Sequence, residues 1–148
     1  MMKFKYDLQN ILNLKEKMEE QKKMALKNAH QHLEVQKDKL NHLHDRLDAS
    51  NGSFRDRVCH TIKVREIRTL NHINQYMQTC IREQNTVVEQ ATYEVESKRV
   101  ALTEALMEKK MYEKLKANAY ESYKVAFNKE EQKKLDEIVS YKYCKIAR

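Results

Sequence analysis

The sequence has very few of the residues that let a chain turn: one glycine, Gly52, and no proline among 148 residues. Average usage would supply about ten glycines and about seven prolines. Because tight turns between strands depend on Gly, Pro, Asn and Asp, this scarcity argues against β-sandwiches, barrels and doubly wound α/β folds. Glycine-rich phosphate-binding loops are excluded as well, since they need several glycines close together.

Long apolar runs are missing too. No run exceeds three residues, whereas a membrane-spanning helix needs roughly 20, so we expect no membrane insertion. The first seven residues show no apolar core of a secretory signal. Cys59, Cys80 and Cys144 are odd in number and far apart, which favours free thiols in a reducing compartment over a disulfide framework. Together these absences favour a cytoplasmic location.

Charged residues are abundant but mixed in sign. They make up 34% of the chain and leave a net charge of +7. Acids stand beside the basic pairs, whereas a DNA-reading helix would be poorer in acids. A helix lying on a membrane would separate a broad apolar face from a lysine-rich face, and that separation is also absent. The acid-free basic stretches are short, among them the tail at residues 142–148, so we expect no nucleic acid partner.

One segment has the features of a break between two helices. Ser50-Asn51-Gly52-Ser53 combines residues that tolerate the left-handed conformation ending a helix with a start that resembles a capping box. We therefore predict an all-α fold, a long antiparallel two-helix coiled-coil hairpin with its turn near Asn51-Gly52. The chain is expected to be a single coiled-coil domain over 1–148. Its expected parts are helix one at about 3–49, the turn at 50–53, helix two at about 54–141 and the basic tail at 142–148.

Apolar residues recur at coiled-coil spacing in both halves. In the first half the seven-residue repeat is formed by Leu26, Ala29, Leu33, Gln36, Leu40, Leu43 and Leu47. Nearer the N-terminus, the seam positions are occupied by Lys15, Glu19 and Lys22. In the second half the 3-4 spacing is formed by Ile73, Met77, Cys80, Gln84, Val87 and Ala91. After these residues we expect the register to move by one residue, to Val95, Leu102 and Leu106.

The two expected helices differ in length. At 1.5 Å per residue, helix one would span ~70 Å and helix two ~130 Å. Pairing outward from the turn would leave roughly 40 residues of helix two, from about residue 100, without a partner inside the hairpin. This overhang contains several Tyr and Met residues, which are enriched at interfaces. We expect it to fray or to bind another protein.

Histidine and cysteine form no catalytic or metal-binding pattern. The pairs His30/His32 and His42/His44 have a spacing that points the two rings of each pair in different directions on a helix. Nucleophilic catalysis needs a pocket that excludes water, which a two-helix coiled coil does not provide. We therefore expect no catalytic residue, no metal site, no cofactor and no enzymatic activity.

The two ends of the chain resemble a known family. Residues 4–16 combine an aromatic start with a Leu-rich first turn, and the C-terminal third contains Glu113-Lys114-Leu115-Lys116 and the charged segment 130–138. Around a long charged hairpin, these segments resemble the flagellar export protein FliJ, and the resemblance covers nearly the whole chain. It implies an antiparallel two-helix coiled coil similar to the central stalk of rotary ATP synthases.

The resemblance also implies a function. It indicates a cytosolic, non-enzymatic component of the bacterial flagellar type III export apparatus, peripheral at the cytoplasmic face of the inner membrane. The implied partners are the export ATPase FliI, whose ring assembly it promotes, the export gate protein FlhA, and empty export chaperones. We expect the ATPase contact to involve Leu135, Asp136, Glu137 and Ile138. We expect the gate contact to involve Ile67, Leu70, Ile73 and Met77, of which the last three stand at places where that family tends to carry aromatics.

Two other functions stay open. One is a helical export chaperone, which would form a stable one-to-one complex with an export substrate. The other is a generic coiled-coil scaffold that associates with itself through the overhang.

Overall fold

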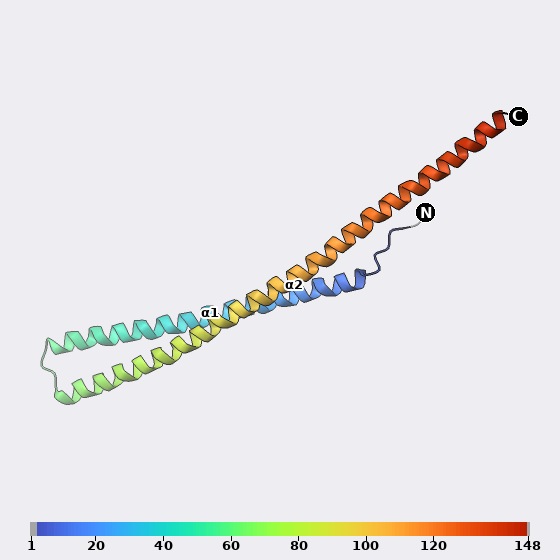
Figure 1. Ribbon diagram of the computed structural model, residues 1–148. Helices are drawn as coiled ribbons and strands as arrows, with labels where there is room; N and C mark the ends of the chain where they lie inside the picture. The colour runs from blue at the N-terminus through green and yellow to red at the C-terminus, as the bar shows by residue number, and fades with distance from the viewer. Residues whose placement is uncertain (1–2, 148) are drawn as a thin grey trace. The chain divides into compact units, whose positions relative to one another are not determined.

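The computed structural model describes residues 3–147, and these residues form two helices and no strand. Helix α1 spans Gln9–Val58 and helix α2 spans Val64–Ile146, with residues 59–63 joining them (Figure 1). Long helices suit this chain because it has no proline and only one glycine to interrupt them. The expected all-α hairpin of two helices is confirmed.

The described residues fall into two compact units, and each contains a stretch of both helices. The turn unit is Gln21–Thr103, with the end of α1, the turn and the first part of α2. The terminal unit consists of residues 3–20 and 104–147, with the start of α1 and the rest of α2. Each unit has its own contacts between the two helices.

A narrow apolar seam joins the helices of the turn unit. Its buried centre is formed by Ala29, Leu33, Ala91 and Val95, against which Leu26 and Val88 pack. These residues share one face of each helix because they lie three or four positions apart. The seam continues toward the turn through the half-buried residues Leu40, Leu43 and Leu47. The repeat predicted for the first half of the chain is therefore confirmed.

The seam on α2 keeps one register, which differs from the prediction. Ile73 and Val87 are exposed at its edge instead of lying within it. The apolar pattern of the sequence favours the row that contains Ile73 and Val87, because Asn74 and Lys98 lie in the observed seam at positions that apolar residues usually fill. The expected move by one residue is therefore wrong. In the turn unit the seam of α2 is formed by Ile67, Leu70, Asn74, Met77, Ile81, Gln84, Val88, Ala91, Val95, Lys98 and Leu102.

Polar side chains in this seam bond to one another across the two helices. Gln84 Nε2 donates to Gln36 Oε1 at 2.8 Å and to the Gln36 backbone oxygen at 3.0 Å. Ser50 Oγ donates to Asn74 Oδ1, and Asn74 Nδ2 donates to Asn51 Oδ1, both at 2.9 Å. Since a buried polar group without a partner costs about 1–3 kcal/mol, these bonds favour one pairing of α1 with α2 over shifted pairings.

The turn lies later than the sequence predicts. Helix α1 continues through residues 50–53 to Val58, so the predicted turn near Asn51-Gly52 is wrong. Gly52 does not have a positive φ, and a Cβ added there would meet open space, so it is an ordinary helical residue. Its polar neighbours Ser50 and Asn51 bond to α2 and do not form a turn. The chain reverses after α1, where His60 N donates to the Arg57 carbonyl oxygen at 3.1 Å.

Two carboxylate–lysine contacts join the helices of the terminal unit. Lys109 Nζ lies 2.7 Å from Glu19 Oε2, and Lys15 Nζ lies 2.6 Å from Glu108 Oε2. Glu19 is 4% exposed, and Leu12 in the same seam is 3% exposed. The hydrogen bond to each carboxylate raises the pKa of Lys15 and of Lys109 above the ordinary 10.5. Lys15 and Glu19 thus occupy the seam, as predicted, whereas Lys22 is exposed and its predicted seam position is wrong.

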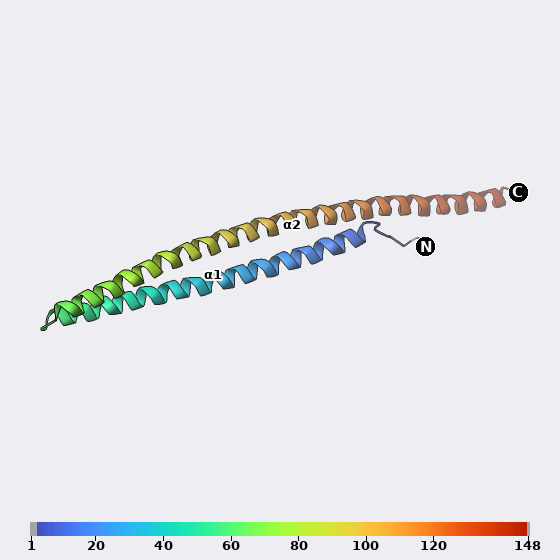
Figure 2. The ribbon, with the colours of Figure 1, turned by 90° about the horizontal axis from the view of Figure 1, so that it is seen from below.

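Residues 3–8 are not helical and lie along α2 in the terminal unit (Figure 2). The ring of Phe4 meets the ring of Tyr120 edge-on at 5.2 Å, and the ring of Tyr123 lies 5.5 Å away. Tyr6 Oη donates to the Tyr112 carbonyl oxygen at 3.2 Å. Tyr123 also stacks on Phe127 at 6.0 Å. We call Phe4, Tyr120, Tyr123 and Phe127 the aromatic cluster.

The part of α2 without a partner is shorter than expected. Contacts with Lys15, Glu19 and residues 3–8 reach as far along α2 as Tyr123, so an overhang from about residue 100 is wrong. The overhang is shorter for two reasons. Helix α1 continues further at its turn end than predicted. Residues 3–8 are not helical, and an extended segment covers about 3.3 Å per residue against about 1.5 Å in a helix, so they reach further along α2. Residues 128–147 are all exposed.

The predicted basic tail is helical to Ile146, and Arg148 lies outside the described residues.

Candidate partner-binding surfaces

The first candidate surface is the α2 end, by which we mean residues 128–147. No other described segment of the terminal unit lies beside it in either view (Figures 1 and 2). Leu135 is 61% exposed and Ile138 is 54% exposed. The residues expected to contact the ATPase therefore lie where a partner can reach them: Leu135, Asp136, Glu137 and Ile138.

The α2 end carries an apolar stripe on one side. At 100° per residue, its aliphatic side chains fall within a sector of roughly 100°, and Asp136 and Glu137 fall outside that sector. A helix with such a stripe and no partner is marginal in water, because most helical stability in proteins comes from packing an apolar face. The stripe is formed by Leu135, Ile138, Val139 and Ile146.

The four residues expected at the gate contact divide between two environments. Ile67, Leu70 and Met77 are half-buried in the seam of the turn unit, whereas Ile73 is 41% exposed. A partner can therefore reach Ile73 directly, while the other three residues mainly hold α2 against α1.

Ile73 lines an open groove in the turn unit, of about 460 Å³. We call it the turn-unit groove. Tyr76, which is 71% exposed, stands in it beside Cys80. Hydrogen bonding with Cys80 raises the pKa of Tyr76 above its ordinary value of 10.0. The groove is lined by Leu43, Arg46, His72, Ile73, Tyr76, Met77 and Cys80.

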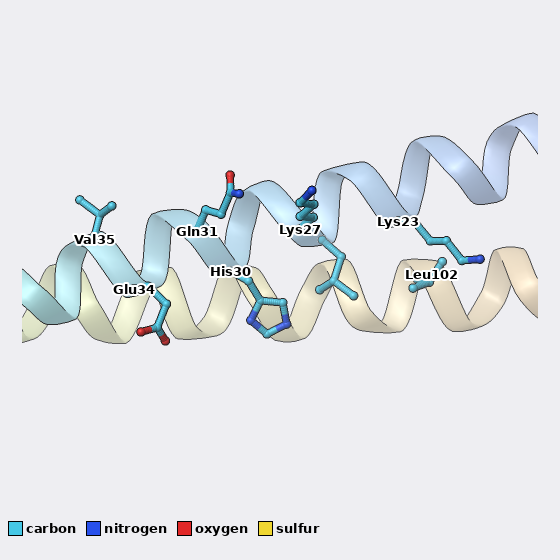
Figure 3. Close-up of a pocket in the computed structure, with 8 residues that line it drawn as sticks. Lys23, Lys27, His30, Gln31, Glu34, Val35 and Leu102 are labelled. Atoms are coloured by element: carbon cyan, nitrogen blue, oxygen red, sulfur yellow. The ribbon is translucent and has the colours of Figure 1, made fainter.

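A second open groove of the turn unit, of about 800 Å³, runs along α1. Leu26 and Leu102 give it an apolar part. Figure 3 shows Val35 and Gln31 on one side of the α1 ribbon and His30 and Glu34 on the other. The polar groups therefore do not converge on one point, as they would around a substrate. The remaining lining residues are Lys23 and Lys27.

The histidines and cysteines have ordinary surroundings. Within residues 3–147, no three His, Cys, Asp or Glu side chains gather closely enough to hold a metal ion. A ring nitrogen of His60 lies 3.0 Å from the Asp56 carbonyl oxygen, which is a local contact within α1 and the turn. Cys59 and Cys144 are exposed and Cys80 is half-buried, all as free thiols. Neither α1 nor α2 has the apolar stretch that a membrane crossing requires.

Sequence reasoning missed the aromatic cluster as a unit. Tyr120, Tyr123 and Phe127 are three and four residues apart, a spacing that places them on one helix face and could have indicated that this face is covered. The covering residue, Phe4, could not be identified in the same way. It belongs to a non-helical segment, whose path along α2 follows no periodic pattern.

The fold and these surfaces define a class of protein: a helical hairpin whose exposed apolar side chains lie on helix faces and in open grooves, where other helices can pack. Comparison with protein families identifies the particular one, because the family model described as "Flagellar FliJ protein" matches residues 4–147. The chain belongs to the FliJ family and is a component of the flagellar export apparatus. No curated protein and no solved structure matches it.

Proposed function

We propose that this protein binds the export ATPase FliI as a central stalk and promotes assembly of the ATPase ring. In this role it links the ring to the export gate protein FlhA and to export chaperones, at the cytoplasmic face of the inner membrane. One observation carries the proposal: the α2 end exposes an apolar stripe on a helix without a partner. Such a helix gains stability when another protein buries its stripe.

Ring assembly would follow from a difference in affinity. A stalk that contacts several ATPase subunits at once binds the assembled ring more tightly than a single subunit, and it shifts the assembly equilibrium by that difference. Leu135 and Ile138 supply apolar area for the contact, while Asp136 and Glu137 can pair with basic groups of the ATPase. No catalytic group of this chain is needed.

We assign the gate contact to the turn-unit groove. Ile73 and Tyr76 are its exposed apolar and aromatic members and would touch FlhA, whereas Ile67, Leu70 and Met77 keep α2 packed against α1. An Ile73→Ser variant is expected to weaken binding to FlhA while leaving the thermal unfolding temperature unchanged.

The ATPase contact is tested with the double variant Leu135→Ser/Ile138→Ser. Burial of one such side chain contributes about 1.5–3 kcal/mol, so losing both should weaken binding to FliI by about tenfold or more. The affinity is measured by fluorescence anisotropy with a labelled chain. The matched control is Tyr93→Ser/Val100→Ser, which removes two exposed apolar residues from the turn unit and should bind as the wild type does. Equal affinity of the Leu135/Ile138 variant and the wild type would contradict the assignment.

A further inference from the structure

We propose that one flank of the terminal unit is a docking surface for an amphipathic helix of another protein, whose apolar stripe is bordered by Asp and Glu. The docked helix would pack against α1 and α2 together and complete a three-helix bundle. We call this surface the methionine flank. The surface is separate from the α2 end and from the turn-unit groove, so the proposal does not rest on the proposed function.

Exposed apolar side chains gather on both helices of this flank. On α1, Leu14 is 55% exposed, and Ile11 and Met18 share its face at spacings of three and four residues. On α2, Met107 is 66% exposed, with Met111 and Leu115 following at intervals of four. Methionine is flexible and is often used at surfaces that bind helices. The full set is Ile11, Leu14, Met18, Met107, Met111 and Leu115.

An ion pair places the two stripes on the same side of the hairpin. Lys15 Nζ lies 2.6 Å from Glu108 Oε2. Ile11 is one helical turn before Lys15, and Met111 is about one turn after Glu108, so both neighbour the pair on its own side. A helix lying over this ion pair would therefore contact apolar residues of α1 and α2 at once.

The other flank of the terminal unit has a different chemistry. Glu16 of α1 and Glu113 of α2 lie there, and Glu113 Oε1 lies 3.9 Å from Lys109 Nζ. The apolar surface is thus confined to one side. A symmetric two-helix coiled coil would have charged side chains along both flanks, so the difference favours a third helix on the methionine flank alone.

The charges bordering the methionine flank favour an acidic occupant. Lys17 stands at its outer edge on α1, and Lys114 stands at its outer edge on α2, close to Met107 around the helix. Among the described residues, neither of these two lysines forms an ion pair. Glu104 also lies on the flank, outside the Lys15–Glu108 pair. Asp and Glu side chains on both sides of the apolar stripe of the docked helix could therefore pair with these lysine ammonium groups.

The same charges disfavour two other occupants. An anionic membrane would bring phosphates against Glu104 and Glu108, which lie within the surface. A second copy of the chain would offer either the same flank, whose border is also basic, or its own exposed helix, the α2 end. That segment contains five lysines, at 129, 133, 134, 142 and 145, against four acids, at 130, 131, 136 and 137. Its excess of lysine does not complement Lys17 and Lys114.

The test uses two synthetic amphipathic peptides of roughly 20 residues, long enough to follow the flank. Both have Leu at the stripe positions; one has Glu beside the stripe and the other has Lys. Binding to the full chain is measured by isothermal titration calorimetry. We expect the Glu peptide to bind about tenfold or more tightly than the Lys peptide at low salt, with the difference shrinking as salt is raised.

Two variants locate the binding site. Met107→Ser/Met111→Ser should weaken binding of the Glu peptide by about tenfold, and Lys17→Glu/Lys114→Glu should reverse the preference between the peptides. Tyr93→Ser/Val100→Ser is the matched control and should change neither affinity. Circular dichroism checks that each variant keeps its helices, which is expected because the altered residues are exposed.

Three outcomes would overturn the proposal. The first is equal binding of both peptides, or binding that the Met107/Met111 variant does not reduce. The second is a dimer in sedimentation that this variant dissociates, which would assign the flank to a second copy. The third is binding to phosphatidylglycerol vesicles that the variant abolishes, which would assign the flank to a membrane. None of these outcomes bears on FliI binding by the α2 end, so the two proposals fail independently.

Discussion

Individual polar side chains, more than apolar ones, decide how α1 and α2 pair. The apolar seam is made of repeating Leu, Val and Ala residues, which would fit almost as well after a shift by seven positions. Gln36 with Gln84, Asn74 with Ser50 and Asn51, and Glu19 with Lys109 each have partners only in the observed pairing. A shifted hairpin would leave these groups buried without those partners, at a cost in free energy of folding.

The Lys109–Glu19 pair gives a testable pH dependence. The hydrogen bond to Glu19 raises the pKa of Lys109 above 10.5 in the folded protein. The folded state therefore holds the Lys109 proton more tightly than the unfolded chain does. The resulting stability is fully present below pH 10.5 and is lost as the pH rises through the higher folded-state pKa. The wild type should therefore lose more unfolding free energy between about pH 10 and 12 than a Lys109→Met variant. Urea denaturation at several pH values measures this, and parallel curves for the two proteins would contradict it.

The Gln36–Gln84 contact gives a second prediction at this scale. Gln84→Leu removes the donor that bonds to Gln36 and should lower the free energy of unfolding by about 1–2 kcal/mol. The double variant Gln36→Leu/Gln84→Leu removes both polar groups and should recover most of that loss. Gln90→Leu, at an exposed site of α2, is the control and should have little effect. An equal effect of Gln84→Leu and Gln90→Leu in chemical denaturation would show that the contact does not form.

At the scale of the elements, the sequence predicts the helices well and their boundaries less well. The absence of proline and the repeat from Leu26 to Leu47 are enough to predict two paired helices. The turn could not be placed, because Asn51 and Gly52 have the local chemistry of a helix end while Asn51 has a long-range partner in Asn74. The α2 seam could not be predicted for a related reason. Asn74 and Lys98 lie in the seam, and a search for apolar residues at seam spacing does not find polar ones.

The α2 end shows what could and could not be predicted of the candidate site. Leu135 and Ile138 were predicted as contact residues, and they are exposed. The gate contact was expected alongside it from the same resemblance, yet Ile67, Leu70 and Met77 lie half-buried in the seam. Periodicity identifies an apolar row, but it cannot tell whether the row faces α1 or a partner unless the register is known.

Gly52 offers a direct test of the later turn. In the middle of a helix, with a negative φ and room for a Cβ, Gly52→Ala should raise the free energy of unfolding by about 0.5–1 kcal/mol. Ala49→Gly, at an exposed site of the same helix, is the matched control and should lower it by a similar amount. A decrease with Gly52→Ala in thermal or urea denaturation would mean that this residue has a left-handed conformation in a turn.

At the scale of the whole molecule, membership in the FliJ family and the distribution of exposed surface support one account. The two helices hold each other through a narrow seam in each unit, and no described residue beyond Phe127 takes part. The α2 end therefore contributes little to the stability of the hairpin. We propose that its stripe serves a partner, and that the turn-unit groove and the methionine flank offer further binding surfaces. Above all, we propose that the α2 end promotes assembly of the export ATPase ring.

The ATPase rate of the cognate FliI, followed over a range of low FliI concentrations, tests this claim most directly. The full chain should raise the rate, with a dependence on FliI concentration that steepens as ring assembly requires. A chain ending at Phe127 should keep its unfolding temperature and raise the rate little or not at all. An unchanged rate with the full chain and active FliI, or equal stimulation by the shortened chain, would contradict the account.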